Sequence, residues 1–310
     1  MKKQFLIFLF FLPLPLLAQV TNVRAGQSGQ DIVITYDLAE SAEVRAYMSV
    51  GGQPFVELHS AQGDVGCVAK GTNRAITWSP LAESDEFLAD NVVFKVEAPH
   101  AFVDLGLPSG TLWATCNVGA NAPEEPGNLF AWGETTRYLV TSSKYEGLYG
   151  GMFFTEENYK YHGESAFSVS KYGHGDSFGP HDNLTQLELV DDAANFNWGG
   201  KWCMPTAEQW KELKKNCTWK WISNYNSTSI AGYQVVSKNN GNRIFLPVTG
   251  QGWEDFCAYT RDGSGAYWSS SLGEGLSISA SGLWFDSKHV KTEGTFRRYG
   301  RSVRPVYNKK

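Results

Sequence analysis

The stretch Met204-Pro-Thr-Ala-Glu-Gln-Trp-Lys-Glu-Leu-Lys-Lys215 contains the clearest helix signal in this chain of 310 residues. Thr206 follows a proline and stands three residues before Gln209. This is the spacing of a capping box, in which each side chain bonds the backbone N–H of the other residue. Trp210 and Leu213, three residues apart, fall on one face. The stretch therefore predicts a short helix that packs on a core through that face.

The region around this helix is expected to contain strands and long loops. A second short helix is expected after Asp191 or Asp192, because acidic residues cap helix N-termini, and Gly199-Gly200 would end it. The other periodic segments are short and are separated by glycine-rich loops. The expected strands are residues 111–114, 243–247, 266–270, 282–286 and 302–306. Two short helices with scattered strands predict an α+β domain over residues 99–310.

Eight runs in this region, taken in order, carry a resemblance to a known family. They are Asp104-Leu-Gly-Leu-Pro-Ser-Gly-Thr-Leu-Trp-Ala-Thr-Cys-Asn-Val-Gly-Ala120, Ala131-Trp-Gly-Glu-Thr135, Asp191-Asp-Ala-Ala194, Trp198-Gly-Gly200, Met204-Pro-Thr206, Ile244-Phe-Leu-Pro247, Tyr267-Trp-Ser-Ser-Ser271 and Arg298-Tyr-Gly-Arg-Ser-Val-Arg-Pro-Val306. The series covers roughly residues 101–307 and resembles the Fibrobacter succinogenes major paralogous domain family. The resemblance implies a C-type lectin-like fold, shared with formylglycine-generating enzymes and with hypervariable receptor-binding proteins. It implies an exported surface domain and no particular reaction.

Residues 19–98 show a different pattern, in which apolar and polar residues alternate with period two. Ile32, Ile34, Tyr36 and Leu38 share one face of the first such strand. Turn residues separate the alternating segments, as at Gly51-Gly52, Gly63-Asp64 and Ser79-Pro80. Several short strands in about 80 residues predict an all-β sandwich of the immunoglobulin or fibronectin type III kind. Pro99 and His100 mark the expected junction with the second domain.

Residues 1–18 have the features of a signal peptide. Lys2 and Lys3 precede an apolar run from Phe5 to Ala18, which is shorter than the about 20 residues that span a bilayer. Small Ala18 before Gln19 is typical of a cleavage site, and a retained membrane anchor is the alternative. The sequence thus predicts a secreted or cell-surface protein without a membrane span after cleavage.

The composition is that of a globular, mildly acidic protein. Hydrophobic residues make up 42% of the chain and charged residues 19%, and the formal charge is -5. An acidic balance excludes a nucleic-acid backbone as the expected partner. Aromatic residues make up 14%, and ten of the eleven tryptophans lie beyond residue 100. The second domain therefore has a large aromatic area for packing and recognition.

The cysteines leave their pairing open. They are Cys67, Cys116, Cys203, Cys217 and Cys257. An exported protein can form disulfides, but an odd number leaves at least one thiol unpaired, and short pairs such as C-x-x-C are absent. Buried apolar cysteines are expected rather than bridges, and the same spacing disfavours zinc. In the resembled family Cys116 and Cys217 occupy positions that often hold cysteine, whereas Cys203 replaces a usual arginine.

The sequence leads us to expect no metal, no cofactor and no enzymatic activity. The sequence lacks the Glu-Pro-Asn or Gln-Pro-Asp triplet of calcium-dependent lectins, and Glu125-Pro126-Gly127 predicts a turn. The histidines of residues 161–182 lack regular ligand spacing and indicate a surface loop. Formylglycine-generating enzymes use a late cysteine pair, and no cysteine follows Cys257.

Two clusters of charged residues have structural interpretations. Adjacent Asp191 and Asp192 point apart at a helix start, so helix capping is favoured over a glycosidase pair facing across a sugar. Four arginines, Arg297, Arg298, Arg301 and Arg304, lie near the C-terminus. Strand alternation places them on two faces, so they are expected to pair with acids at the edges of the domain rather than to clamp one anion.

Recognition is predicted on the loop of residues 250–265. Aromatic side chains on polar loops provide recognition area at low entropic cost. The predicted ligand-binding residues are Trp253, Glu254, Asp255, Tyr259, Arg261 and Asp262. In the resembled fold, hypervariable relatives carry binding residues in this late stretch. Trp219, Trp221 and Tyr225 are further aromatics among polar residues, and packing over the core is an equal alternative for them.

These observations favour a non-enzymatic binding protein that recognises a glycan or a surface protein, as in adhesion, without calcium. One alternative is a structural subunit of a surface fibre or appendage. Another is a divergent enzyme of the formylglycine-generating kind. Exposed aromatics would favour recognition, an open edge strand would favour assembly, and a buried polar pocket with perturbed pKa values would favour catalysis.

Overall fold

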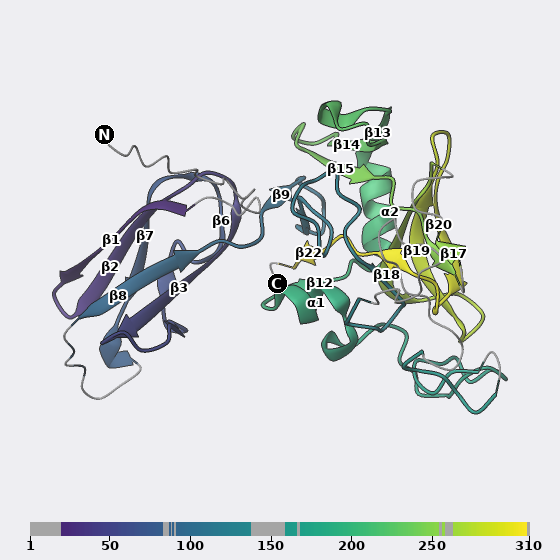
Figure 1. Ribbon diagram of the computed structural model, residues 1–310, viewed down its shortest axis with the longest axis horizontal. Coiled ribbons are helices and arrows are strands. Elements are labelled where there is room, and N and C mark those ends of the chain that lie inside the picture. The colour runs from purple at the N-terminus through teal and green to yellow at the C-terminus, as the bar shows by residue number, and fades with distance from the viewer. Residues whose placement is uncertain are drawn as a thin grey trace, which may run out of the picture. The chain divides into compact units, whose positions relative to one another are not determined.

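The computed structural model describes most of the chain. The described residues are 20–82, 87, 89, 91–137, 159–165, 168–253, 256–257 and 263–308. The chain divides into two compact units, Met1–Pro99 and His100–Lys310. Both are rich in antiparallel β-sheet (Figure 1). The expected signal peptide, residues 1–18, lies outside the described residues. In the described part, no helix is sufficiently long and apolar to span a membrane.

The first unit consists of two antiparallel sheets. One has the strand order β1-β2-β7-β5; in the other, β3 pairs with β4 and β6 along one side and with β8. The strands are β1 (Val20–Ser28), β2 (Asp31–Leu38), β3 (Ala42–Val50), β4 (Val56–Glu57), β5 (Gln62–Gly63), β6 (Gly66–Val68), β7 (Gly71–Trp78) and β8 (Val92–Glu97), and a 3-10 turn, η1 (Pro80–Ala82), follows β7. The rings of Trp78 in β7 and Phe94 in β8 lie 6.1 Å apart, so the two sheets pack face to face. Alternate residues of β2, Ile34, Tyr36 and Leu38, are buried between them, as the period of two predicts.

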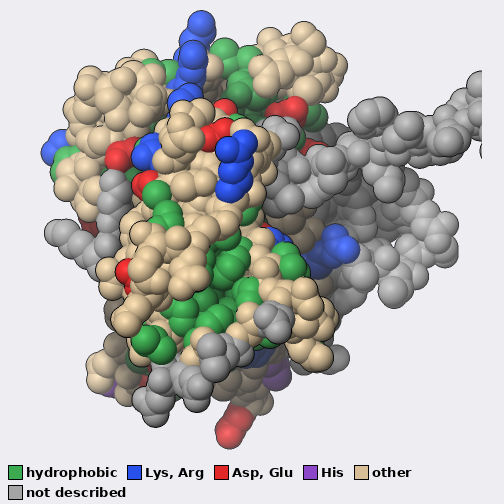
Figure 2. Space-filling model, turned by 90° about the vertical axis from the view of Figure 1, so that its left-hand side faces the viewer, with side chains coloured by type: hydrophobic (Ala, Val, Ile, Leu, Met, Phe, Trp, Pro, Cys, Tyr) green, Lys and Arg blue, Asp and Glu red, His purple; other side chains and the backbone are tan. Residues whose placement is uncertain are grey.

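Strand β8 lies at an edge of its sheet. It pairs with β3 along its whole length, and no strand in the described ranges pairs with its other side. A cleft of about 420 Å³ adjoins it, lined by Gln27, Gly29, Gln30, Ile32, Pro80, Leu81, Phe87, Ala89, Val92 and Phe94. Hydrophobic side chains gather in the middle of the face drawn in Figure 2. Leu81 and Val93 are more than half exposed, at 51% and 55%. An open strand edge beside apolar surface is a feature that strand-mediated association uses.

The second unit combines short helices with several small sheets. Its elements are β9 (Phe102–Asp104), β10 (Leu112–Ala114), β11 (Leu129–Phe130), η3 (Leu189–Asp191), α1 (Ala193–Trp198), β12 (Trp202–Cys203), α2 (Ala207–Asn216), β13 (Cys217–Ile222), η4 (Tyr225–Ser227), β14 (Gly232–Ser237), β15 (Arg243–Pro247), β16 (Gly252–Trp253), β17 (Phe256–Cys257), β18 (Gly265–Leu272), β19 (Ser279–Phe285), β20 (Val290–Phe296), β21 (Arg301–Ser302) and β22 (Val306–Tyr307). The sheet orders are β12-β22-β10-β9, β11-β21-β18-β19-β20, β13-β14-β15 and β16-β17. Because β10 pairs with both β9 and β22, the first and last strands of this unit lie in one sheet.

The two predicted helices are confirmed together with their caps. In α2 the Thr206 hydroxyl accepts from the Gln209 N–H at 3.1 Å, and the Gln209 side chain accepts from the Thr206 N–H at 2.8 Å. Trp210 is fully buried on the inner face of α2. Asp192 caps α1, and Gly199 ends it. The helix starts thus follow from local hydrogen bonding that the sequence already contains.

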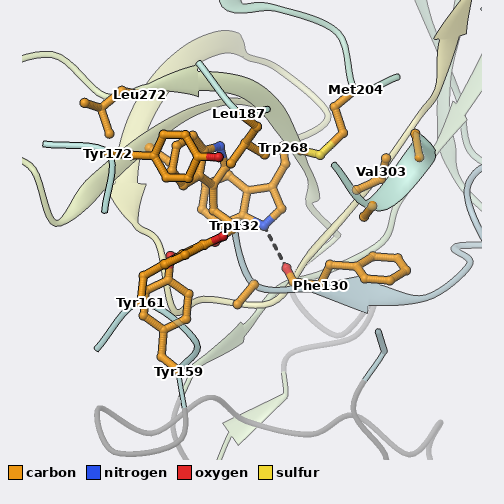
Figure 3. Close-up of a cluster of buried hydrophobic side chains, with 14 of the residues drawn as sticks. Phe130, Trp132, Tyr159, Tyr161, Tyr172, Leu187, Met204, Trp268, Leu272 and Val303 are labelled. Carbon is orange, nitrogen blue, oxygen red and sulfur yellow. Dashed lines mark hydrogen bonds between the residues drawn. The ribbon is translucent and has the colours of Figure 1, made fainter. Parts of the chain in front are cut away.

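The core of the second unit is built around aromatic side chains in two clusters. In one cluster, Trp132 and Trp268 are fully buried (Figure 3). Each indole N–H donates a hydrogen bond to a backbone carbonyl near the other tryptophan in the sequence. The Trp268 indole N–H donates to the Phe130 carbonyl at 2.7 Å, and the Trp132 indole N–H donates to the Ser269 carbonyl at 2.8 Å. The second cluster lies against α2 and includes Trp113, Trp210, Tyr233, Tyr267 and Phe285. Among the tryptophans of this unit, Trp202, Trp210 and Trp268 are fully buried, whereas Trp198 and Trp284 are half-buried.

Candidate functional site

The outer face of the β13-β14-β15 sheet, with the loop that follows β13, forms a cleft in the second unit. Successive residues of each strand point to opposite faces of this sheet. Trp219 and its partner Val235 lie on the inner face, against the core. Gln234 and its partner Phe245 lie on the outer face. Trp221 shares the inner face with Trp219. For these two tryptophans, the structure therefore favours core packing over surface recognition.

Tyr225 lies on the other side of this sheet. It begins the short η4 turn, and its half-buried ring stacks on the ring of buried Phe245, with centroids 3.8 Å apart and planes 11° from parallel. The two rings form part of a cleft of about 390 Å³, within the size range of ligand pockets. The cleft is lined by Val103, Thr115, Pro123, Tyr225, Asn226, Gln234, Arg243, Ile244 and Phe245.

The loop that carries Tyr225 is held in an unusual backbone conformation. Asn226, Ser227 and Ser229 have φ angles of 47°, 62° and 63°, although none is glycine. The Ser229 N–H donates to the Asn224 side chain at 2.7 Å, and the Thr228 hydroxyl donates to the Tyr225 carbonyl at 2.6 Å. Left-handed non-glycine residues are costly and concentrate where a loop must hold a functional side chain in place.

Gly232 in β14 leaves room for the stacked rings. A Cβ atom at this position would lie 2.7 Å from Cζ of Phe245 and 2.3 Å from the Leu246 carbonyl oxygen. Any larger residue would therefore displace the Phe245 ring or the neighbouring strand. The absence of a side chain lets Phe245 extend across β14 toward Tyr225.

Buried Arg304 supports the cleft from the protein interior. Its guanidinium donates to the carbonyls of Thr115 and Phe245, both at 2.9 Å, and to the Asn117 side chain at 2.7 Å. Thr115 and Phe245 both line the cleft but belong to different parts of the chain. A single side chain thus joins two parts of the cleft wall, an arrangement suited to a pre-formed site.

Of the described residues that line the cleft, one is charged, and this residue is basic. Arg243 is exposed at the start of β15, and within the described residues its guanidinium has no carboxylate at ion-pair distance. Lys220, opposite Gln234, adds a second positive charge on the same sheet face. Hydroxyl and amide groups of Tyr225, Asn226 and Gln234 complete a surface suited to a polar ligand that contains a flat apolar face.

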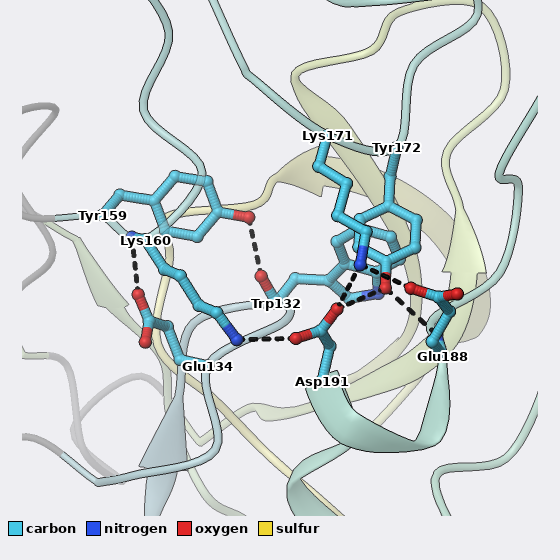
Figure 4. Close-up of polar contacts among 8 residues, drawn as sticks. All are labelled: Trp132, Glu134, Tyr159, Lys160, Lys171, Tyr172, Glu188 and Asp191. Atoms are coloured by element: carbon cyan, nitrogen blue, oxygen red, sulfur yellow. Dashed lines mark hydrogen bonds and ion pairs between the residues drawn. The ribbon is translucent and has the colours of Figure 1, made fainter. Parts of the chain in front are cut away.

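A buried charge cluster forms around Asp191 (Figure 4). Its carboxylate, 3% exposed, accepts hydrogen bonds from the Lys160 ammonium at 2.6 Å, the Lys171 ammonium at 2.8 Å and the Tyr172 hydroxyl at 2.5 Å. Burial alone would raise the pKa of Asp191, but these hydrogen bonds outweigh it and lower the pKa. A carboxylate engaged in this way is a poor general base, so we assign the cluster a structural role. Of the two residues expected to cap the following helix, Asp191 and Asp192, it is Asp192 that caps it.

Asp192 lies at the buried N-terminus of α1. It accepts from the backbone N–H groups of Ala194, Asn195 and Met204. Burial raises its pKa to about 6, although these hydrogen bonds act in the opposite direction. Asp192 and Asp191 therefore have different partners and opposite pKa shifts, and they do not form a pair across a ligand.

Three of the four C-terminal arginines differ from the expectation of ion pairs at the domain edges. Arg297, Arg301 and Arg304 are at most 1% exposed. Of these three, only Arg301 has an ion pair within the described residues, with Glu293 at 2.8 Å. The guanidinium carbons of Arg297 and Arg301 lie over the rings of Trp132 and Trp268, at 4.8 and 5.1 Å from their centroids. Alternation along a strand does not predict this, because backbone carbonyls and indole faces can contact a buried guanidinium in place of an acid.

The predicted recognition loop falls largely outside the described residues. This holds for Glu254, Asp255, Tyr259, Arg261 and Asp262. Of Trp253 only the backbone is described, in β16, which pairs with β17. The prediction for this loop stays a prediction. Of the aromatic residues that the sequence suggests for recognition, only Tyr225 is found in the described cleft.

The carboxylates of the histidine-rich segment bind backbone groups. Asp182 accepts from the N–H groups of Tyr172, Gly173 and Leu184, and Asp176 accepts from those of Phe178 and Ser277. His174 contacts the Gly273 carbonyl at 2.8 Å. Within the described ranges, no three His, Cys, Asp or Glu side chains are grouped as metal ligands. These carboxylates order loops, which is a common role of Asp.

The cysteines described in the second unit are poor nucleophiles. Cys116, Cys203 and Cys217 are free thiols. Burial, with a contribution from Asp192, raises the pKa of Cys203 to about 12, and burial raises that of Cys217 to about 11. Burial also raises the pKa of Cys116. Because the thiolate is the reactive form, these environments disfavour thiol chemistry.

Comparisons with protein-family models, with curated proteins and with solved structures found no match to this chain.

Proposed function

We propose that this chain is an exported, non-enzymatic glycan-binding protein that acts at the cell surface or after secretion. In this proposal the first unit is a spacer of the immunoglobulin or fibronectin type III kind. The second is a calcium-independent C-type lectin-like domain of the Fibrobacter succinogenes major paralogous family. The likeness of the eight sequence runs supports the family proposal. The Tyr225 and Phe245 stack in a polar cleft supports recognition of a glycan over that of a surface protein.

The chemistry of the cleft matches that of a sugar. A pyranose ring has a C–H face that packs on an aromatic ring and hydroxyls that bond amide groups at its rim. Tyr225 offers such a ring, and Asn226 and Gln234 offer amides. Phe245 and Arg304 hold the aromatic floor in place without a ligand, which lowers the entropic cost of binding.

A glycan array screened with the mature protein tests this proposal. We expect at least one glycan to bind, and we expect Tyr225→Ala to weaken that binding by about 1–3 kcal/mol, as loss of an aromatic anchor does. The matched control is Phe196→Ala, which removes an exposed aromatic side chain from α1 and should leave binding unchanged. Melting curves would show that both variants are folded.

A second pair of changes separates the cleft from the loop predicted from the sequence. Trp253→Ala and Tyr259→Ala should leave affinity unchanged if the cleft is the site. If these two changes abolish binding while Tyr225→Ala does not, recognition belongs to residues 250–265, and our placement of the site is wrong.

The open edge of β8 favours one alternative, assembly of the protein into a surface fibre. A strand from a neighbouring copy that paired with β8 would also cover the adjoining apolar cleft. In this case light scattering should show a mass that rises with concentration. Val93→Lys on β8 should suppress the rise, whereas Val56→Lys, at an equally exposed valine on β4, should not. A constant monomer mass at all concentrations would exclude assembly through this edge.

A further inference from the structure

The charge of the cleft narrows the class of sugar that it would bind. The chain carries 32 acidic and 27 basic residues, yet among the described residues the only charged one that lines the cleft is Arg243. Lys220 stands on the same sheet face, next to Gln234. A basic cleft on an acidic protein favours an anionic ligand. Lys220 is itself a cation and the other described lining residues are uncharged, so an anionic ligand would neutralise the charge of Arg243.

Arg243 also differs from the arginines of the core. Arg297 and Arg304 direct their donors to backbone carbonyls, and Arg301 is paired with Glu293. Arg243 is exposed, and the described residues provide no carboxylate for it. Its guanidinium is therefore available to a ligand, at the same cleft as the Tyr225 ring.

We propose that the cleft recognises a glycan that carries a carboxylate, such as a uronic acid or a sialic acid, and that Arg243 binds this carboxylate. This inference rests on the proposed glycan-binding function. A planar guanidinium binds a carboxylate through two parallel hydrogen bonds, which gives geometric specificity that a lysine lacks. Tyr225 would pack on the ring face of the sugar, while Asn226 and Gln234 would bond its hydroxyls.

The test compares acidic oligosaccharides with their methyl esters by calorimetry on the mature protein. The probes are trisaccharides of galacturonic, glucuronic and mannuronic acid and sialyllactose, each as the free acid and as the methyl ester. The ester keeps the ring and its hydroxyls but removes the charge. We expect at least one free acid to bind with an affinity about ten-fold higher than that of its ester, or more. The ratio of acid to ester affinity should decrease as salt is added.

Substitutions assign the preference to one side chain. Arg243→Ala should bring the ratio of acid to ester affinity close to one, and Arg243→Lys should restore only part of it. Arg24→Ala removes an exposed arginine from the first unit and should leave the ratio unchanged. Tyr225→Ala should weaken the acid and the ester alike.

The outcomes separate this inference from the function on which it rests. If a sugar and its ester bind equally and Tyr225→Ala weakens both, the glycan site stands and the carboxylate preference is wrong. If a sulfated trisaccharide binds in place of every carboxylate probe, and does so through Arg243, the ligand class is wrong. If no probe and no array glycan binds, both the proposed function and this inference are overturned.

Discussion

At the scale of single residues, Asp191 is the best example of a side chain whose role depends on distant parts of the chain. Its partners Lys160 and Lys171 precede it by 31 and 20 residues. We expect Asp191→Asn to lower the free energy of unfolding by about 3 kcal/mol, because two ammonium groups and the Tyr172 hydroxyl lose a shared buried partner. Denaturant unfolding measures this loss.

Glu188 provides the matched control for that prediction. It binds the same Lys171 ammonium but is 52% exposed. Glu188→Gln should therefore cost less than about 1 kcal/mol, since exposed ion pairs contribute little. Equal losses for the two variants would mean that burial of the Asp191 carboxylate does not set its contribution.

The neighbouring Asp192 predicts a dependence of stability on pH. Its pKa is raised from 3.8 to about 6 in the folded protein, so the folded chain holds a proton that the unfolded chain has released between these values. The contribution of Asp192 to stability therefore falls as pH rises from about 4 to about 6, by up to about 3 kcal/mol.

Unfolding free energies of the wild type and Asp192→Asn at about pH 4 and about pH 7 test this sign. The advantage of the wild type over the variant should be larger at the lower pH. An advantage independent of pH, or one that grows as pH rises, would contradict the raised pKa. The contribution of Asp191 to stability should have the opposite pH dependence. Because its pKa is lowered in the folded protein, this contribution is lost only as pH falls below the pKa of Asp191 in the unfolded chain.

At the scale of secondary structure, the sequence predicts elements well where the signal is local. The caps of α1 and α2 and the full extent of β15 follow from residues within or next to each element. The hairpin of β13 and β14 is not predicted, because β13 begins at Cys217 directly after α2, without a glycine or proline between them. The single strand expected over residues 302–306 is wrong: β21 and β22 are separate, and Pro305, which lacks a backbone N–H, stands between them.

That hairpin explains why the cleft cannot be derived from the sequence. Only its polar neighbours mark Tyr225 for recognition. Its contact with Phe245 requires the register of β14 against β15 and the return of the η4 loop over the sheet. In the sequence, Arg243 is only the start of an expected strand. Alternation gives the two faces of a strand, but long-range pairing decides which face lies inside.

The close approach at Gly232 gives a prediction for this sheet. Gly232→Ala should destabilise the second unit by about 1–3 kcal/mol, because the added Cβ would overlap the Phe245 ring and the Leu246 carbonyl. It should also weaken glycan binding by displacing the stack with Tyr225. Gly26→Ala in β1 is the control, since no atom lies within 4 Å of the place that its added Cβ would occupy and its φ is not positive. If the two variants melt at the same temperature, Gly232 is not required for packing.

At the scale of the whole molecule, the alternation of residues 19–98 predicts a β-rich first unit, and the structure confirms its sheets. Helices and strands of the second unit are predicted in part, while its likeness to a lectin-like family stays a proposal. Neither composition nor periodicity predicts that arginines are buried beside tryptophans, because both patterns treat arginine as a surface residue.

The proposal that the fold does not require calcium gives a prediction for the whole protein. The lectin triplets are absent from the sequence, and the carboxylates Asp176 and Asp182 are bonded to backbone N–H groups. The melting temperature of the mature protein should therefore be the same with chelator and with added calcium. A rise of several degrees with calcium would reveal a site that depends on other ligands.

The reciprocal bonds of Trp132 and Trp268 have a consequence for measurement. Both indoles are fully buried, and each N–H is bonded to a carbonyl of the region that carries the other ring. Neither proton can reach water unless these regions separate. In deuterated buffer, the two indole signals in NMR spectra should therefore persist far longer than those of exposed groups, and their exchange should report the global opening of the second unit rather than local motion. Exposed loop amides that exchange at once would provide the internal reference.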